Sequence, residues 1–114
     1  MMPFRVILLP RAEADMEANA QWWATHHSIE QAAHWFEAIH DQLKSLERFP
    51  GSNGLSAENG DFPYEIRDKL LGSGPRPSYR AVFTIKDDTV YVLTVRRSAQ
   101  DVIRPGDLEA APAE

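Results

Sequence analysis

Cysteine is absent from the 114-residue sequence, which excludes disulfide bonds, thiolate chemistry and cysteine-ligated metal sites. The sequence also lacks any apolar run near the roughly 20 residues that a membrane-spanning helix needs. No basic segment followed by an apolar one, the pattern of a secretory signal, begins the chain. We therefore expect a soluble cytoplasmic protein without membrane contact, and the length predicts one domain.

Groups that exchange a proton near neutral pH are scarce in the C-terminal part of the chain. All four histidines, His26, His27, His34 and His40, precede residue 41, and no tyrosine, histidine or lysine follows Ser98. His26 and His27 are adjacent at a predicted helix end, where neighbouring side chains point in different directions and no close carboxylate completes a metal site. We expect neither a metal nor a cofactor.

The most strand-like stretch is residues 78–97, in which two runs rich in β-branched and aromatic residues flank a polar turn at Asp87-Asp88. This arrangement predicts a β-hairpin. Apolar residues on both of its faces favour a place at the centre of a sheet. An antiparallel hairpin brings its outer ends together, so we expect Arg80, Arg96 and Arg97 to gather at one end of the sheet.

Side chains alternate between the two faces of each predicted strand. The residues expected on one face of the first hairpin strand are Tyr79, Ala81, Phe83 and Ile85. In the second strand, Val90, Val92 and Thr94 are expected on one face and Tyr91, Leu93 and Val95 on the other.

Further strands are predicted at residues 4–9 and 64–71 from their length and β-branching. Between them lie two predicted amphipathic helices, residues 11–25 and 28–49. Ser28, with Gln31 three residues on, is typical of a capping box. The buried stripes are expected to comprise Ala12, Met16, Ala20 and Trp23 in the first helix, and Ala32, Phe36, Ile39, Leu43 and Leu46 in the second.

The resulting order, β-α-α-β-β-β, predicts an α+β domain: an N-terminal strand, an antiparallel helical hairpin and then a three-stranded antiparallel sheet. Residues 1–103 are expected to form this single domain, and residues 104–114 a flexible C-terminal tail.

Positive charge is concentrated in the predicted sheet. Residues 64–104 carry 8 basic and 5 acidic side chains, whereas residues 1–63 carry 4 basic and 9 acidic ones. A local excess of this kind suits an anionic partner, although a solvated strand rim has it as well.

Four short motifs occur along the chain in the order of a known family. They are Leu9-Pro-Arg-Ala-Glu-Ala-Asp15, the apolar positions of residues 33–50, Ser78-Tyr-Arg-Ala-Val-Phe83 and Val92-Leu-Thr-Val-Arg-Arg97. Together with the element order, they resemble the RelE/ParE toxin superfamily of bacterial toxin–antitoxin systems over roughly residues 4–103. The N-terminal half is more similar to the ParE-like branch, often described as plasmid-stabilisation proteins.

The resemblance implies a RelE/ParE-like fold and a toxin that is neutralised by a cognate antitoxin. ParE-like members inhibit DNA gyrase, whereas RelE-like members are ribosome-dependent mRNA endoribonucleases. We expect a ParE-like toxin that binds a macromolecular target, with DNA gyrase as the implied target, rather than an enzyme. The alternatives are a RelE-like endoribonuclease acting on the ribosome, or a degenerate, non-toxic family member.

The nuclease alternative has three candidate catalytic residues. By resemblance, Arg80 matches the family's Tyr-Arg on the first hairpin strand, and Arg67 a basic position on the strand before it. Cleavage at a ribose 2′-OH needs a group that takes up the hydroxyl proton, and arginine stays protonated at neutral pH. Lys69, beside Arg67, is the one group there that a lowered pKa would suit to the task.

Candidate binding residues fall into two sets. Arg80, Arg96 and Arg97 are the candidates for target binding, and their alternative role is in rim salt bridges with Glu65, Asp68 and Asp101.

Trp22 and Trp23 are the candidates for partner binding, because two adjacent helical residues cannot both point inward and an exposed tryptophan favours a protein interface. Antitoxins of the family usually wrap the toxin with a helix and a strand. We therefore expect a hydrophobic groove along the helical hairpin or a free sheet edge. The resemblance leaves open a homodimer or a toxin–antitoxin hetero-oligomer.

Overall fold

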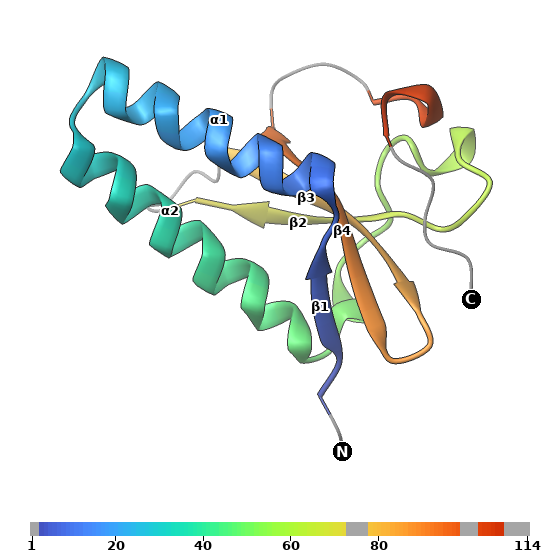
Figure 1. The fold of residues 1–114 in the computed structure, drawn as a ribbon. Helices are drawn as coiled ribbons and strands as arrows, with labels where there is room; N and C mark the ends of the chain where they lie inside the picture. Colours follow the sequence, from blue (N-terminus) through green and yellow to red (C-terminus); the bar gives the residue numbers. More distant parts are fainter. Residues whose placement is uncertain (1–2, 73–77, 99–102, 109–114) are drawn as a thin grey trace.

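The fold is that of a computed structural model, which describes residues 3–72, 78–98 and 103–108 (Figure 1). The predicted β-α-α-β-β-β order is confirmed. The strands are β1 (Arg5–Leu8), β2 (Arg67–Leu71), β3 (Tyr79–Lys86) and β4 (Thr89–Arg97), and the helices are α1 (Pro10–His26) and α2 (Ile29–Lys44). No helix in these ranges combines the length and the hydropathy needed to cross a membrane.

The four strands form one sheet in the order β1-β4-β3-β2. The predicted antiparallel pairings join β2, β3 and β4, while β1 adds to β4 in parallel and makes the sheet mixed. The hairpin between β3 and β4 turns at Asp87-Asp88 as predicted, with Asp87 at a φ of 55°. Aspartate tolerates this left-handed conformation better than most residues.

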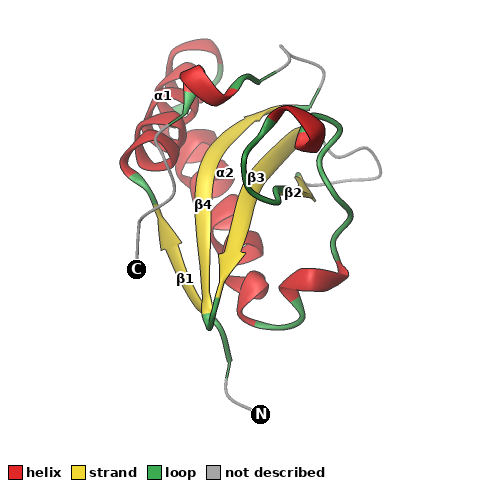
Figure 2. Ribbon diagram, turned by 90° about the vertical axis from the view of Figure 1, so that its right-hand side faces the viewer, coloured by secondary structure: helices red, strands yellow, loops and turns green. Residues whose placement is uncertain are grey.

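Helices α1 and α2 form an antiparallel hairpin on one face of the sheet (Figure 1 and Figure 2). The predicted cap of α2 is present, since the Ser28 side chain accepts a hydrogen bond of 3.0 Å from the Gln31 backbone N–H. The first-helix stripe is partly confirmed, because Ala12 and Met16 are buried while Ala20 and Trp23 are only partly so.

The predicted buried stripe of α2 is wrong at one position. Trp35, and not Phe36, lies in the core with Ile39 and Leu43, while Phe36 is 37% exposed. Both are large apolar residues one position apart, so helical periodicity alone does not choose between them. In the fold Trp35 faces the sheet, where its ring packs on that of Tyr79 of β3 at 5.2 Å between centroids.

A second apolar cluster lies on the sheet face away from the helices. It is centred on Val82 of β3 and Leu93 of β4, with Leu9, Ile66 and Ile103. Residues 54–66 and 103–108, rather than helices, supply its cover. Residues 64–66 belong to this cover, and β2 therefore begins at Arg67 instead of the predicted Tyr64.

A β-bulge changes the predicted alternation on β4. The ladder pairs Val82 with Thr94 but Phe83 with Val92, so Leu93 is an extra residue. Beyond such a bulge the alternation of side chains reverses relative to the partner strand. Val95 consequently joins the helix-side core, contrary to the expectation that it shares a face with Leu93.

Candidate functional site

Arg80 of β3 is a charged residue inside the protein. Its strand neighbours Tyr79 and Ala81 face the helices, so alternation turns Arg80 to the opposite face, toward Val82's cluster. Only 7% of Arg80 is exposed. A guanidinium at this depth needs paired charge and hydrogen bonds to offset its lost hydration.

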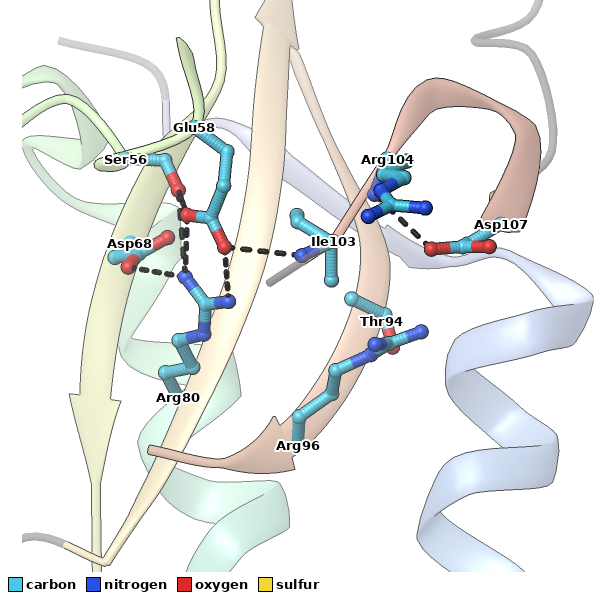
Figure 3. Close-up of polar contacts among 9 residues, drawn as sticks. All are labelled: Ser56, Glu58, Asp68, Arg80, Thr94, Arg96, Ile103, Arg104 and Asp107. Carbon is cyan, nitrogen blue, oxygen red and sulfur yellow. Dashed lines mark hydrogen bonds and ion pairs between the residues drawn. The ribbon is translucent and has the colours of Figure 1, made fainter. Parts of the chain in front are cut away.

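Two carboxylates meet this need (Figure 3). Glu58 binds Arg80 in a bidentate pair, with Nη2 donating to Oε2 at 2.6 Å and Nη1 to Oε1 at 2.9 Å. Asp68 on the neighbouring strand β2 accepts from Nη1 at 3.0 Å. Bidentate arginine–carboxylate pairs are among the strongest hydrogen-bonded contacts in proteins.

Glu58 is itself held by its surroundings. The Ser56 hydroxyl donates to Oε1 at 3.1 Å, and the backbone N–H of Ile103 donates to Oε2 at 3.1 Å. The hydrogen bond from Arg80 lowers the pKa of the Glu58 carboxyl to about 2, against the opposing effect of burial. The same hydrogen bond, from the other side, raises the pKa of Arg80. Both groups are therefore charged across the physiological range.

The predicted ion pairs of the arginines are only partly those observed. Asp68 pairs with Arg80, as expected of one of the three acids. Glu65 pairs instead with Arg67, at 3.0 Å, and Asp101 lies outside the described residues. Glu58, the principal partner, was missed, because its loop carries no sequence pattern that predicts a contact with a strand 22 residues away.

The three candidate target-binding arginines do not form one cluster. The register sets Arg96 directly opposite Arg80, and Arg96 donates from Nε to Thr94 Oγ1 at 3.2 Å. Arg97 is opposite Tyr79, so it points to the helical face, with its guanidinium 4.4 Å from the centre of the Trp22 ring. The expectation of three neighbouring guanidiniums is therefore wrong for Arg97, because adjacent residues on a strand face opposite ways.

Trp22 and Trp23, the predicted partner-binding pair, are both half-buried near the C-terminal end of α1. Trp23 packs against the core and donates from Nε1 to the Tyr79 hydroxyl at 3.2 Å. The Trp22 ring stacks on His26 at 4.4 Å between centroids and contacts Arg97.

Among the described residues, no three histidine, aspartate or glutamate side chains are grouped as a metal site.

The candidate nuclease residues lie on opposite faces of the sheet. Arg67 and Lys69 are paired with Phe83 and Ala81, which face the helices, whereas Arg80 faces the other way. Residues paired across strands share a face, so neither Arg67 nor Lys69 points to the side on which Arg80 lies.

A groove runs where β1 meets the helical hairpin. Two neighbouring cavities of about 270 and 340 Å³ share Leu8 and His40 as lining residues. Val6, Leu43, Met16 and Phe36 add further apolar lining, and Glu13, Glu17, Lys44 and Glu47 supply the charged residues. Of the described strands, β1 pairs only with β4, and its other edge borders this groove.

Comparison with known proteins agrees with this fold. The family model for the ParE toxin of the type II toxin–antitoxin system ParDE matches residues 6–102. A chain of the chromosomal ParDE system from P. aeruginosa has a TM-score of 0.67 and 21% identity, covering 82% of this chain and 95% of that one. A mutant of the E. coli toxin RelE in the free state has a TM-score of 0.51 and 20% identity, covering 86% of each chain. No curated protein matches the chain at a significant level.

Proposed function

Because this chain belongs to the ParE toxin family of type II toxin–antitoxin systems, we propose that it is a cytoplasmic toxin that inhibits DNA gyrase by binding and is neutralised by a cognate antitoxin. The proposal covers three points: the target, the non-enzymatic mode of action and the antitoxin.

The observation that carries the non-enzymatic mode is the divergence of Arg67 and Lys69 from Arg80. RNA cleavage needs a proton acceptor and a cation at the same scissile phosphate. Arg80 is committed to Glu58 and Asp68, and the nearest candidate for a proton acceptor, Lys69, is on the other face. A toxin that acts by binding needs no such convergence.

Target contact is proposed for Arg80, Arg96 and Arg97. Among them, Arg96 is the best residue to test by substitution. It is half-buried, and it has no ion pair with any residue that the structure describes. Its removal therefore leaves no buried carboxylate unpaired. Arg80, in contrast, supports the fold through Glu58, so its substitution would mix loss of stability with loss of binding.

Neutralisation is proposed to take place at the groove shared by β1 and the helical hairpin. A free strand edge accepts an extended peptide by backbone hydrogen bonds, and an adjacent apolar groove accepts the apolar face of a helix. Leu8 and His40 lie where the two cavities meet. Trp22 and Trp23, at the far end of α1, are proposed as a further contact for a partner that continues along the helices.

The test compares the two toxin activities directly. Purified chain is added to a gyrase supercoiling reaction and, separately, to a cell-free translation reaction followed by primer extension on the mRNA. We expect loss of supercoiling with intact mRNA. The Arg96→Ala variant should inhibit gyrase at least tenfold more weakly, and Arg5→Ala, which changes an exposed arginine of β1, serves as the matched control.

Site-specific mRNA cleavage with normal supercoiling would replace this proposal with the RelE-like endoribonuclease. Absence of both effects at concentrations that saturate a cognate antitoxin would identify a non-toxic family member.

A further inference from the structure

The C-terminal segment of residues 103–108, called the strap below, crosses the sheet face that carries Arg80. Ile103 is completely buried in the cluster formed with Leu9, Ile66, Val82 and Leu93, and Leu108 packs at its margin. Residues 105–107 form a short 3₁₀ turn between these two anchors. Ile103 is the last residue of the predicted domain. Of the predicted tail, Leu108 packs on this cluster, whereas residues 104–107 are exposed.

Polar contacts also hold the strap, in addition to its apolar anchors. The Ile103 N–H donates to Glu58 Oε2 at 3.1 Å, and Arg11 Nη1 of helix α1 donates to the Asp107 carbonyl at 3.1 Å. Glu58 Oε2 is also the oxygen that receives Arg80 Nη2 at 2.6 Å (Figure 3). One carboxylate oxygen thus joins the strap directly to the buried guanidinium.

The Arg80 cluster is incompletely paired under this cover. Arg80 Nε and Asp68 Oδ1 are both buried, and neither has a hydrogen-bond partner among the residues that the structure describes. A buried polar group without a partner carries a desolvation cost. Arg80 Nε is therefore an unused donor, and with only 7% of Arg80 exposed it is out of reach of an outside acceptor in this closed state.

We infer that the strap is a displaceable cover which hides Arg80 in the free chain, and that Glu58 is the latch that holds it closed. Lifting the strap removes Ile103 from the cluster and exposes Arg80 beside the apolar residues Val82 and Leu93. This combination fits a protein partner that presents a carboxylate next to an aliphatic side chain. The inference rests on the proposed function only in counting Arg80 among the target-binding residues.

Hydrogen exchange on the free, full-length chain tests the opening. The Ile103 amide should exchange through an opening at least tenfold more frequent than that of the β3 amides, because residues 104–107 of the strap are exposed whereas β3 is a central strand. Chemical modification of Arg80 by phenylglyoxal, read by mass spectrometry, should follow the Ile103 opening. Exposed Arg5 provides the internal reference.

If Ile103 exchanges only together with β3, the strap opens only by unfolding of the whole domain and the inference is wrong. It is equally wrong if Arg80 modification follows the β3 amides and not Ile103.

Two variants test whether the strap itself limits access to Arg80. Ile103→Ala removes the apolar anchor but keeps the N–H that donates to Glu58, and it should raise the modification rate of Arg80 at least tenfold without changing that of Arg5. Pro105→Ala, at an exposed strap position, should change neither rate. If the amide at position 103 of the Ile103→Ala variant exchanges faster while Arg80 modification is unchanged, then the loop that carries Glu58, and not the strap, covers Arg80. Both measurements use the free chain, so their outcome is independent of whether gyrase is the target.

Discussion

At the scale of single residues, the Arg80–Glu58 pair is the main charged contact on the sheet face away from the helices. Burying two charges costs hydration that their attraction only partly returns, and removing one of them typically costs ~3–5 kcal/mol because the other is left unpaired. Glu58 offsets part of the desolvation cost of Arg80 because both of its carboxylate oxygens accept hydrogen bonds, and Asp68 contributes a third acceptor. The arginine that the sequence offers as a binding residue is therefore also a structural one.

This pair predicts a specific dependence of stability on pH. The folded pKa of Glu58 is about 2 against an ordinary 4.5, so its contribution is complete above pH 4.5 and is lost as the pH falls from 4.5 toward 2. The stability difference between the unmodified chain and Glu58→Gln, measured by urea unfolding, should be on the order of 3 kcal/mol at pH 7 and shrink steadily below pH 4.5.

Glu65→Gln is the control for this measurement, because Glu65 forms an exposed pair with Arg67. Its effect should stay within ~0.5 kcal/mol over the same range. A difference for Glu58→Gln that is constant from pH 7 to pH 3 would contradict the assigned role of the charge.

At the scale of elements, the bulge on β4 and the position of β1 shape the two surfaces of the domain. The extra residue Leu93 reverses the alternation, so that Arg96 faces the same side as Arg80 while Val95 enters the helical core. Strand β1 lies at the sheet edge beside α1 and α2, which creates the groove lined by Leu8 and His40. The groove is thereby on the helical side of the sheet, Arg80 and Arg96 are on the opposite face, and Arg97 is on the helical side.

The groove leads to a prediction for antitoxin binding. His40 is exposed and lines both cavities, so His40→Glu should place a charge in the apolar groove without disturbing the core. We expect at least a tenfold loss of affinity for the proposed cognate antitoxin, measured by calorimetry.

Ala33→Glu is the matched control, since Ala33 is an exposed residue of the same helix that lines neither cavity of the groove nor the cavity beside Trp23. Equal losses for the two variants would show that added negative charge, and not the groove, weakens the complex.

At the scale of the whole molecule, two apolar clusters share the central strands. Phe83 and Val92 belong to the cluster under the helices, and Val82 and Leu93 to the one on the other face. Neither cluster can be lost without removing support from the same two strands. The domain should therefore unfold as one cooperative unit, apart from local opening of the strap.

Two isoleucine methyl groups report on the two faces. Ile39 of α2 is buried between the helices and the sheet, and Ile66 is buried on the opposite face of the sheet. Their folded-state NMR signals should disappear with the same urea midpoint. Earlier loss of the Ile66 signal would mean that the strap-side cluster is an independent unit.

The sequence by itself determined the local structure and much of its order. Strand-forming runs around Asp87-Asp88 specify the hairpin, and Ser28 with Gln31 specifies the start of α2, because turn and cap preferences act within a few residues. The order of the six elements, together with the motifs, was sufficient for the superfamily. The concentration of basic residues in the sheet also follows from the sequence, but not the direction in which each points.

Only the tertiary structure decided which contacts the candidate binding residues make. Glu58 reaches Arg80 across 22 residues and Ile103 across 45, and no local pattern encodes contacts at such separations. Whether Trp35 or Phe36 enters the core depends on which side of α2 faces the sheet, and the face on which Arg97 lies depends on one extra residue at the bulge. These features follow from the packing of segments distant in sequence, because burial and charge pairing are satisfied by whichever neighbours the fold supplies.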